Sequence, residues 1–183
     1  MKVLIPLAEG FEELEAVAAI DVFRRAGWEV TTASLGTAMV KSSGGVRIVA
    51  DAVRHEVTYD SFDILVLPGG ANGTNTLKSE ESVLQAVRTF NKKKKLIAAI
   101  CAAPLVLQEA GILQNRKITG YPSILQQLTV PETLEQRVVV DDNIITSQGP
   151  ATALDFALAV VKAASGAELA NSLANSMLAT CTG

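Results

Sequence analysis

The residue best suited to chemistry is Cys101, one of two cysteines in the chain. It stands between an apolar run typical of a buried strand and Pro104, which suits the first turn of a helix. A sharp strand-to-helix turn of this kind resembles the nucleophile elbow of hydrolases. It exposes a thiol to free backbone N–H groups and to the positive end of a helix dipole, and both favour the reactive thiolate. The alternative is a buried cysteine that serves only as a small apolar side chain.

A second candidate is Glu15, in an acidic segment that follows the first apolar run. Glu12 and Glu13 suit the first turn of a helix, because the helix dipole attracts acids there. Glu15 lies three positions before Ala18, and this spacing predicts a carboxyl group that points inward toward the end of the sheet. A buried carboxyl has a raised pKa and can donate a hydrogen bond to a thiolate or move a proton. The alternative is a glutamate in solvent.

The third candidate is the glycine-rich segment at residues 67–73, Leu-Pro-Gly-Gly-Ala-Asn-Gly. Glycines let the backbone approach a ligand or a neighbouring turn closely. We expect the N–H of Gly70, together with the N–H of Ala102, to form an oxyanion hole beside Cys101. The alternative is an ordinary glycine-rich turn, because the segment matches neither a P-loop nor the dinucleotide-binding GxGxxG pattern.

The sequence contains a single histidine, His55, in a polar connection that the pattern does not place at the carboxyl end of a strand. Ser-His-Asp enzymes need a histidine beside the nucleophile, and Cys/His zinc sites need three or four ligands close together. We therefore expect no metal site and no Ser-His-Asp catalysis. Asp141 and Asp142 are better explained as a turn than as a cation site. Cys181 is expected in a terminal tail.

Composition limits the partners and the compartment. The chain has 183 residues, a net charge of −3 and 49% hydrophobic residues, which indicates a globular domain without the basic face of a nucleic-acid-binding protein. No segment approaches the roughly 20 apolar residues that span a bilayer, and the N-terminus lacks the pattern of a secretory signal. Two distant cysteines do not form a disulfide framework, so we predict a cytoplasmic protein with reduced thiols.

The elements that must position these residues follow from apolar runs without alternation, which predict strands of a buried parallel sheet. These runs are residues 3–7, 30–33, 64–67, 96–100, 138–140 and 144–145. Helical patterns separate them at residues 12–26, 102–110, 123–128, 151–164 and 167–177, and Ser79 is expected to cap another helix beginning at Glu80. Gly44 and Gly45 predict a hairpin turn between residues 39–40 and 46–49.

Strand–helix alternation predicts one α/β domain over residues 1–183, with a mostly parallel open sheet covered by helices on both faces. Ligands bind such sheets beyond the carboxyl ends of the strands, where the three candidate segments lie.

Four segments, taken in order, resemble the ThiJ/PfpI superfamily, in particular the branch of the Parkinsonism-associated protein deglycase and bacterial YajL. They are residues 8–15 (AEGFEELE), 67–70 (LPGG), 98–104 (AAICAAP) and 146–152 (TSQGPAT). The resemblance implies a flavodoxin-like three-layer sandwich and a homodimer. It also implies that Cys101 is the nucleophile, that protonated Glu15 is its hydrogen-bond partner, and that Gly70 and Ala102 hold an oxyanion.

The activity that the resemblance implies is a cofactor-independent deglycase or glyoxalase. Such a protein acts on methylglyoxal, or on glyoxal adducts of thiols, amines or nucleotides, in defence against oxidative and carbonyl stress. The alternative is a redox sensor or a holdase chaperone for unfolded proteins that uses oxidation of Cys101. An amidotransferase or protease of the same superfamily ranks last, because it needs a Cys–His pair and only His55 is present.

The sequence also departs from the family pattern. Tyr121 stands before Pro122 where many relatives have a histidine, so we expect Tyr121 only to shape the pocket or donate a hydrogen bond, and the enzyme to be slow. Gly44 and Gln148 occupy positions that are basic in relatives. The pocket should therefore be less cationic and less suited to acidic substrates.

Overall fold

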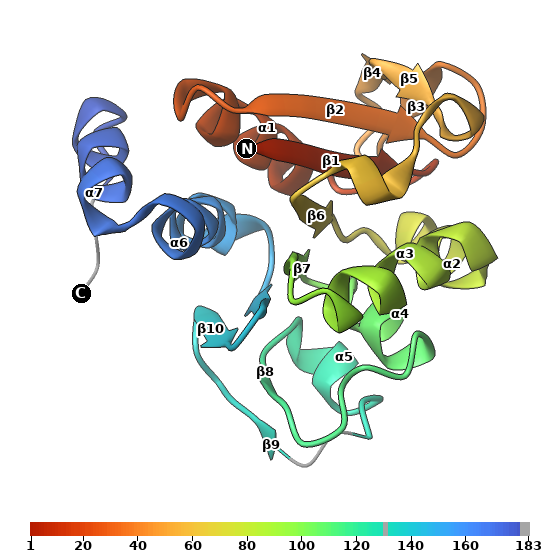
Figure 1. Cartoon of the computed structure of the whole chain (residues 1–183). Helices are drawn as coiled ribbons and strands as arrows, with labels where there is room; N and C mark the ends of the chain where they lie inside the picture. Colours follow the sequence, from red (N-terminus) through yellow and green to blue (C-terminus); the bar gives the residue numbers. More distant parts are fainter. Residues whose placement is uncertain (130–131, 180–183) are drawn as a thin grey trace.

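A computed structural model describes residues 1–129 and 132–179, and a seven-stranded sheet lies at its centre (Figure 1). The strand order is β10-β11-β7-β6-β1-β2-β5, and every neighbouring pair is parallel except β10 and β11. The bounds are β1 Lys2–Leu7, β2 Glu29–Ser34, β5 Ala52–Val53, β6 Ile64–Leu67, β7 Leu96–Ile100, β10 Val138–Asp141 and β11 Ile144–Ser147. The predicted mostly parallel sheet is confirmed.

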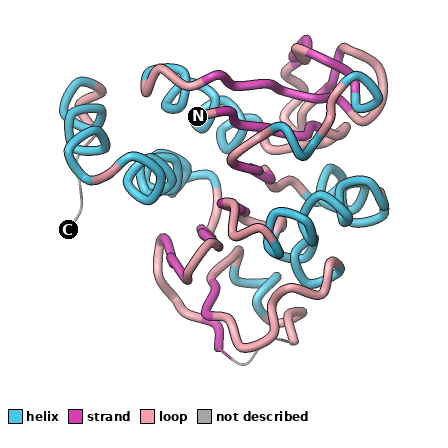
Figure 2. The backbone as a smooth tube through the Cα atoms, in the orientation of Figure 1, coloured by secondary structure: helices cyan, strands magenta, loops and turns pink. Residues whose placement is uncertain are grey.

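Helices cover both faces of this sheet, and Figure 2 shows them on either side of the strands. One layer contains α1 (Glu13–Arg25), α6 (Ala153–Ser165) and α7 (Ala167–Ser176); the other contains α2 (Ala71–Ser79), α3 (Glu81–Lys92) and α4 (Pro104–Glu109). Successive strand side chains point to opposite faces, so Val3 and Ile5 join the first core while Leu4 joins the second. The three-layer α/β fold is confirmed.

Helix α1 shows how local sequence defines an element. Its buried side chains recur at helical spacing, and they are Glu15, Ala16, Ala19, Val22 and Phe23. The helix ends where Gly27 adopts a φ of 74°, a left-handed conformation that glycine takes without strain. Phe23 then stacks on Trp28 with their ring centroids 5.4 Å apart.

Short elements surround the sheet. The hairpin of β3 (Met39–Lys41) and β4 (Arg47–Val49) turns through Gly44 and Gly45, as predicted. The turn from β10 to β11 uses Asp142 with a φ of 55°, as expected from its acidic residues. A small parallel pair of β8 (Lys117–Ile118) and β9 (Glu132–Thr133) and a one-turn helix α5 (Pro122–Leu125) follow β7 and α4.

The helix boundaries predicted after β6 and β7 were partly wrong. Helix α2 was not predicted, because its polar sequence contains one large buried residue, Leu77. Ser79 is the last residue of α2 rather than the cap of α3, whose N-cap is Glu80. Helix α4 begins at Pro104 instead of residue 102, because Cys101 to Ala103 form a separate turn.

Candidate active site

The carboxyl ends of β1, β6 and β7 lie together in the sheet, and the three candidate segments follow these strands. The chain leaves β1 toward β2 on one side, whereas β6 and β7 lie on the other side. The strand order therefore reverses beside β1, which is where open α/β sheets bind ligands. The predicted meeting of the three segments at one edge is confirmed by this topology.

Cys101 occupies a strained turn directly after β7. Its φ of 63° is left-handed, which costs a residue with a side chain about 1 kcal/mol. Two backbone hydrogen bonds fix the turn: the Cys101 N–H donates to the Ser147 carbonyl, and the Tyr121 N–H donates to the Cys101 carbonyl, both at 2.9 Å. The predicted sharp turn is present, and neighbouring strands and loops hold the thiol in place.

Glu15 points inward, as predicted, and only 1% of it is exposed. Its Oε2 accepts a hydrogen bond from the Gly69 N–H at 2.7 Å, while its Oε1 has no partner among the described residues. A Cβ atom on Gly69 would lie 2.6 Å from Glu15 Oε2 and 2.7 Å from Cys101 Cβ. Gly69 therefore lets the carboxyl and the thiol approach each other, a role that the sequence interpretation did not assign to it.

Gly70 has a φ of 90°, and a Cβ atom there would lie 2.3 Å from the Gly10 carbonyl oxygen. Only glycine fits this contact between the loops after β1 and β6. The backbone N–H groups of Gly70 and Ala102 both lower the pKa of the Cys101 thiol, because they stabilise its thiolate form. Both predicted oxyanion donors therefore act on the Cys101 thiol, and their role toward an oxyanion stays a prediction.

Burial raises the pKa of Glu15 from 4.5 to about 7. Hydrogen bonds from Gly69 and from the Cys101 side chain partly oppose this shift, and the charge of Glu12 adds to it. Close to neutral pH the carboxyl group exchanges its proton readily, which suits a group that donates and accepts protons.

Burial also raises the pKa of the Cys101 thiol, to about 12. The charge of ionised Glu15 and its hydrogen bond are the next two causes, while the N–H groups of Gly70 and Ala102 lower the pKa. The backbone N–H groups stabilise the thiolate, as expected, but burial and the charge of Glu15 have the larger, opposite effect on the pKa. Protonation of Glu15 removes its charge and lets its O–H donate to the thiolate, so the proton on Glu15 controls the nucleophile.

Of the other residues that the sequence singled out, Tyr121 adjoins the Cys101 turn, whereas His55 does not. Tyr121 is next to Cys101 through its backbone, with 47% of the residue exposed, and its ring approaches Gly149. Gly44 donates its N–H to Glu13 at 3.1 Å. His55 is exposed in a short 3₁₀ helix after β5. The sequence interpretation missed that His55 follows a strand, β5. Three strands, β6, β1 and β2, separate β5 from β7, so His55 lies away from Cys101.

Cys181 lies outside the described residues. Within residues 1–129 and 132–179, no group of three or more His, Cys, Asp or Glu side chains is arranged to hold a metal ion. None of the described helices is long and apolar enough to cross a membrane.

A model of the DJ-1/PfpI family matches residues 1–163. Protein dj-1beta of Drosophila melanogaster is 42% identical over 178 residues, covering 96% of this chain and 95% of the relative. Glutathione-independent glyoxalase DJR-1.2 of Caenorhabditis elegans is 38% identical over 173 residues, covering 93% and 91%. Two Arabidopsis thaliana relatives, DJ-1 homologs B and A, are longer, and the chain spans 39% and 46% of their lengths.

Solved structures show the same fold. Oxidized DJ-1 of Toxoplasma gondii superposes with a TM-score of 0.94 at 39% identity, covering 98% of both chains. DJ-1beta of Drosophila melanogaster gives a TM-score of 0.92 at 41% identity, covering 97% of both chains.

Proposed function

The chain belongs to the DJ-1/PfpI family, and from this premise we propose that it is a Cys101-dependent glyoxalase or deglycase. Its substrates would be methylglyoxal or glyoxal adducts of thiols, amines or nucleotides. One observation carries the proposal: the buried Glu15 carboxyl and the Cys101 side chain meet across Gly69, where a Cβ atom would lie 2.6 Å from Glu15 Oε2 and 2.7 Å from Cys101 Cβ. The relative named as a glyoxalase supports the same class of reaction.

The proposed reaction begins when the Cys101 thiolate attacks the aldehyde carbon of methylglyoxal. A carbon–sulfur bond forms, and the carbonyl electrons move to the oxygen, where the N–H groups of Gly70 and Ala102 stabilise the negative charge. Glu15 protonates this oxygen to give a hemithioacetal, and then transfers a proton from the former aldehyde carbon to the adjacent carbonyl carbon. The hydroxyl proton of the hemithioacetal passes to the former ketone oxygen, and the carbon–oxygen double bond re-forms beside the sulfur. A thioester results. Water hydrolyses it to a hydroxy acid and restores the thiol, so the reaction consumes one water and no cofactor.

The test compares methylglyoxal turnover by the Cys101→Ser, Glu15→Gln and Cys181→Ser variants with the unsubstituted protein. We expect Cys101→Ser to abolish turnover and Glu15→Gln to lower kcat at least about 100-fold, because Gln cannot transfer the proton. Cys181→Ser is the matched thiol control and should retain full activity. Equal turnover by Cys101→Ser and the unsubstituted protein would contradict the proposal.

A second candidate function is redox sensing through Cys101. The unpartnered Oε1 of Glu15 and the N–H groups at the sulfur provide hydrogen-bonding groups for a cysteine sulfinate. The structure of the Toxoplasma gondii relative is that of its oxidized form. Intact-protein and peptide mass spectrometry after mild peroxide should find two oxygen atoms added to Cys101. Equal oxidation of Cys181 would contradict a site tuned for this modification.

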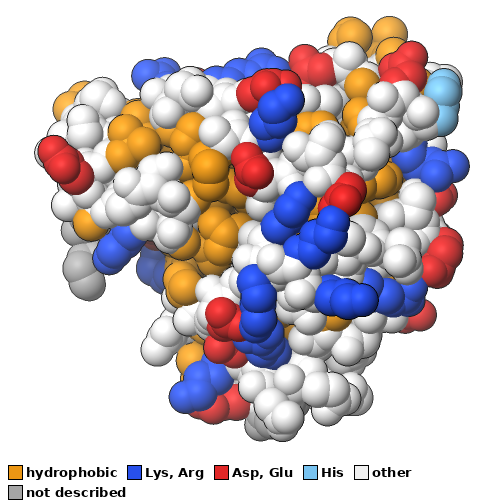
Figure 3. Space-filling view, viewed as in Figure 1, with side chains coloured by type: hydrophobic (Ala, Val, Ile, Leu, Met, Phe, Trp, Pro, Cys, Tyr) orange, Lys and Arg blue, Asp and Glu red, His pale blue; other side chains and the backbone are white. Residues whose placement is uncertain are grey.

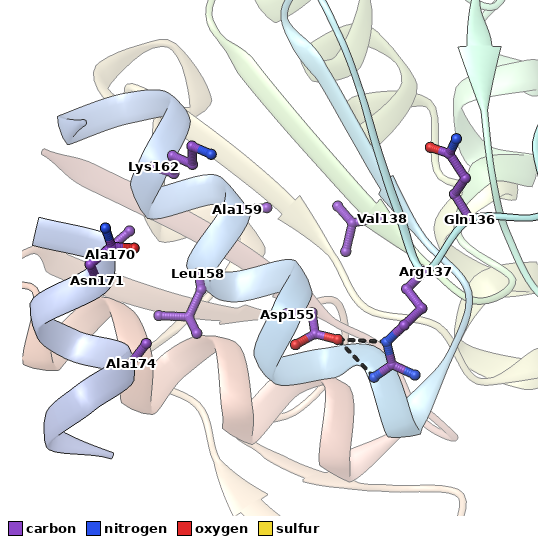
Figure 4. Close-up of a pocket in the computed structure, with 10 residues that line it drawn as sticks. All are labelled: Gln136, Arg137, Val138, Asp155, Leu158, Ala159, Lys162, Ala170, Asn171 and Ala174. Atoms are coloured by element: carbon purple, nitrogen blue, oxygen red, sulfur yellow. Dashed lines mark hydrogen bonds and ion pairs between the residues drawn. The ribbon is translucent and has the colours of Figure 1, made fainter. Parts of the chain in front are cut away.

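A groove on another part of the surface favours holdase activity as an additional role. It lies between α6, α7 and the segment leading into β10, has a volume of about 740 Å³, and is lined by five apolar and five polar or charged residues. Figure 3 shows apolar side chains exposed in this part of the surface. Figure 4 shows Leu158, Val138 and Ala159 lining it, with the Arg137–Asp155 ion pair at one end. Such a groove suits an amphipathic segment of an unfolded protein, with its apolar side chains against Leu158, Val138 and Ala159.

The holdase role is tested by light scattering from an aggregating client protein. Leu158→Glu places a charge in the groove and should weaken the suppression of aggregation. Leu154→Glu, on the same helix at a residue that is 41% exposed and outside the groove lining, is the matched control. Equal suppression by the two variants would exclude the groove as the binding site.

A further inference from the structure

A buried pair of hydroxyl groups lies between β11 and α6. Ser147, the last residue of β11, is 0% exposed, and Thr152, the last residue of the 3₁₀ turn Pro150–Thr152, is 4% exposed. Their hydroxyl oxygens lie 2.6 Å apart, which is a hydrogen-bond distance. A buried hydroxyl without a partner costs free energy, so each of these two groups stabilises the other.

Thr152 does not serve as an ordinary helix cap. It occupies the N-cap position of α6, where a threonine hydroxyl usually accepts a hydrogen bond from an N–H group of the first helical turn. Its side chain accepts none from α6, a helix whose residues are all described. Instead the Thr152 hydroxyl accepts from the Gly149 N–H at 3.1 Å and contacts Ser147. Its hydrogen bonds therefore go to the segment that leads back to β11.

The hydrogen bonds of the two hydroxyls run in one direction. Each hydroxyl has one proton to donate, and Ser147 donates its own to the Arg137 carbonyl at 2.6 Å, so the proton between the two hydroxyls comes from Thr152. The Thr152 hydroxyl also lies 2.8 Å from the Gly149 carbonyl, but that carbonyl already accepts the Thr152 N–H. In such a chain each hydrogen bond strengthens the next.

Arg137 holds the same segment through its side chain. Its Nη2 donates to the Ala151 carbonyl at 2.9 Å. The guanidinium also pairs with Asp155 on α6 at 2.7 Å, as Figure 4 shows. The segment from Ser147 to Thr152 is therefore fixed against the start of β10 and against α6.

Both backbone hydrogen bonds of the Cys101 turn lead to this segment. The Cys101 N–H donates to the carbonyl of Ser147, the residue whose side chain Thr152 holds. The Cys101 carbonyl accepts from the Tyr121 N–H, and the Tyr121 ring lies 3.4 Å from the Cβ position of Gly149. Gly149 is in turn hydrogen-bonded to Thr152. Thr152 thus supports the Cys101 turn from two sides.

The Cys101 turn needs such support because its backbone is strained. Cys101 has a φ of 63°, and a residue with a side chain keeps this conformation only where its surroundings enforce it. Ala102 follows in the same turn, and its N–H stabilises the thiolate. A turn that relaxes would carry this N–H away from the sulfur.

We propose that Thr152 is a positioning residue of the Cys101 site. Acting through Ser147, its hydroxyl holds the Cys101 turn in the strained conformation in which the Ala102 N–H stabilises the thiolate. The proposal gives Thr152 no contact with the substrate. It rests on the proposed function, because it concerns the same site, but alkylation of the thiol measures it without turnover.

The first experiment measures the rate constant for alkylation of Cys101 by iodoacetamide at pH 8, in a Cys181→Ser background. Thr152→Val removes the hydroxyl at nearly constant volume. It should lower the rate about tenfold, because less thiolate is present once the Ala102 N–H has moved away. Thr152→Ser keeps the hydroxyl and should react within about twofold of the unsubstituted protein.

Thr32→Val is the matched control for lost stability. Thr32 is a buried threonine on β2, which β1 and β6 separate from β7. Its hydroxyl donates to the Asp51 carboxylate at 2.7 Å and accepts from the Asp51 N–H at 2.9 Å. This variant should lower the urea midpoint of unfolding, as Thr152→Val does, and leave the alkylation rate unchanged.

Three outcomes of these measurements would overturn the inference. They are a Thr152→Val rate equal to or above that of the unsubstituted protein, a Thr152→Ser rate as low as that of Thr152→Val, and equal slowing by Thr32→Val.

A further variant tests the route through Ser147, and does so even if Thr152→Val does not fold. Ser147→Ala keeps the backbone carbonyl that accepts from Cys101 but removes the partner of Thr152, so it should slow alkylation about as much as Thr152→Val. Because the two substitutions break the same link, the double variant should be no slower than either single one. An unchanged rate in Ser147→Ala, or slowing that multiplies in the double variant, would contradict the proposed route.

Turnover separates this inference from the proposed function. With methylglyoxal, Thr152→Val should lower kcat about tenfold and leave KM within about twofold, because the substitution weakens stabilisation of the transition state rather than binding. Cys101-dependent turnover with equal kcat in the two proteins would refute the positioning role and leave the proposed function standing. Absence of Cys101-dependent turnover in the unsubstituted protein would refute the proposed function, and the alkylation rates would then decide the positioning role alone.

Discussion

At the scale of single residues, Glu15 and Cys101 form one coupled pair. Burial raises the pKa of Glu15 to about 7, and ionised Glu15 in turn raises the pKa of Cys101. Whether the Cys101 sulfur ionises to a reactive thiolate therefore depends on whether Glu15 is protonated. This differs from a cysteine activated by histidine, where a neighbouring positive charge stabilises the thiolate.

Replacing Glu15 with Gln should lower the pKa of the Cys101 thiol, because the negative charge is lost while an amide donor remains. The measurement is the rate of iodoacetamide alkylation against pH, in a Cys181→Ser background. Glu15→Asp retains the charge and should keep the thiol pKa above that of the Gln variant. Identical midpoints for the Gln variant and the unsubstituted protein would show that Glu15 does not act on the thiol.

The raised pKa of Glu15 also predicts the pH dependence of stability. The folded protein keeps this proton up to pH about 7, whereas the unfolded chain releases it near 4.5. The contribution is therefore fully present below pH 4.5 and is lost as pH rises through 7, by up to about 3 kcal/mol. Urea unfolding should show the unsubstituted protein losing stability relative to Glu15→Gln between pH 4 and pH 8. A constant difference across this range would contradict the assignment.

At the scale of elements, the loops after β1 and β6 pack directly against each other at Gly10 and Gly70. Gly70 and Gly10 touch so closely that no side chain fits, and this contact sets where the N–H of Gly70 points. The sequence indicated a glycine-rich turn but could not show its partner, because Gly10 and Gly70 are far apart in the chain.

Gly70→Ala should therefore destabilise the fold by about 2–4 kcal/mol and disturb the oxyanion donor. Gly166→Ala is a matched control, since Gly166 has a φ of 92°, close to the 90° of Gly70, but nothing within 4 Å of its Cβ position. It should cost about 1 kcal/mol through backbone strain alone. Equal losses of unfolding free energy for the two variants would show that the contact with Gly10 is unimportant.

At the scale of the whole molecule, exposed apolar side chains gather on α1 and on the β3–β4 hairpin that Glu13 binds through Gly44. They are Leu14, Val17, Met39, Val46 and Val49. Apolar side chains concentrated on adjoining elements favour an interface between proteins, and we propose that this surface pairs two copies in the homodimer that the sequence predicts.

A charge in this surface should produce monomers. We expect Val49→Asp, at a residue that is 72% exposed, to halve the mass measured by light scattering after size-exclusion chromatography. Val140→Asp is the control, because Val140 is 55% exposed on a strand at the opposite edge of the sheet. A dimer that persists in Val49→Asp, or a monomeric unsubstituted protein, would contradict the proposed interface.

The class of fold and the main candidate site residues could be predicted from the sequence alone. Apolar runs without alternation indicated buried parallel strands. Cys101, Glu15 and the glycine-rich segment each follow one of these strands, and this predicted that all three lie at the same edge of the sheet. These inferences succeeded because strand burial and strand direction follow from local patterning and from connection rules. The single domain over residues 1–183 and the cytoplasmic location stay predictions.

The contacts between residues far apart in the chain, and the charge interactions among them, became visible only in the folded structure. Helix α2 was not predicted because it has no apolar stripe: its close contact with the loop after β1 is made by Gly73, where a Cβ atom would lie 2.9 Å from the Phe11 nitrogen. The role of Gly69 and the raised pKa of Cys101 depend on residues brought together from the ends of β1, β6 and β7. Burial and pairwise charge interactions vary steeply with distance, and distances between remote residues are set only when the sheet assembles.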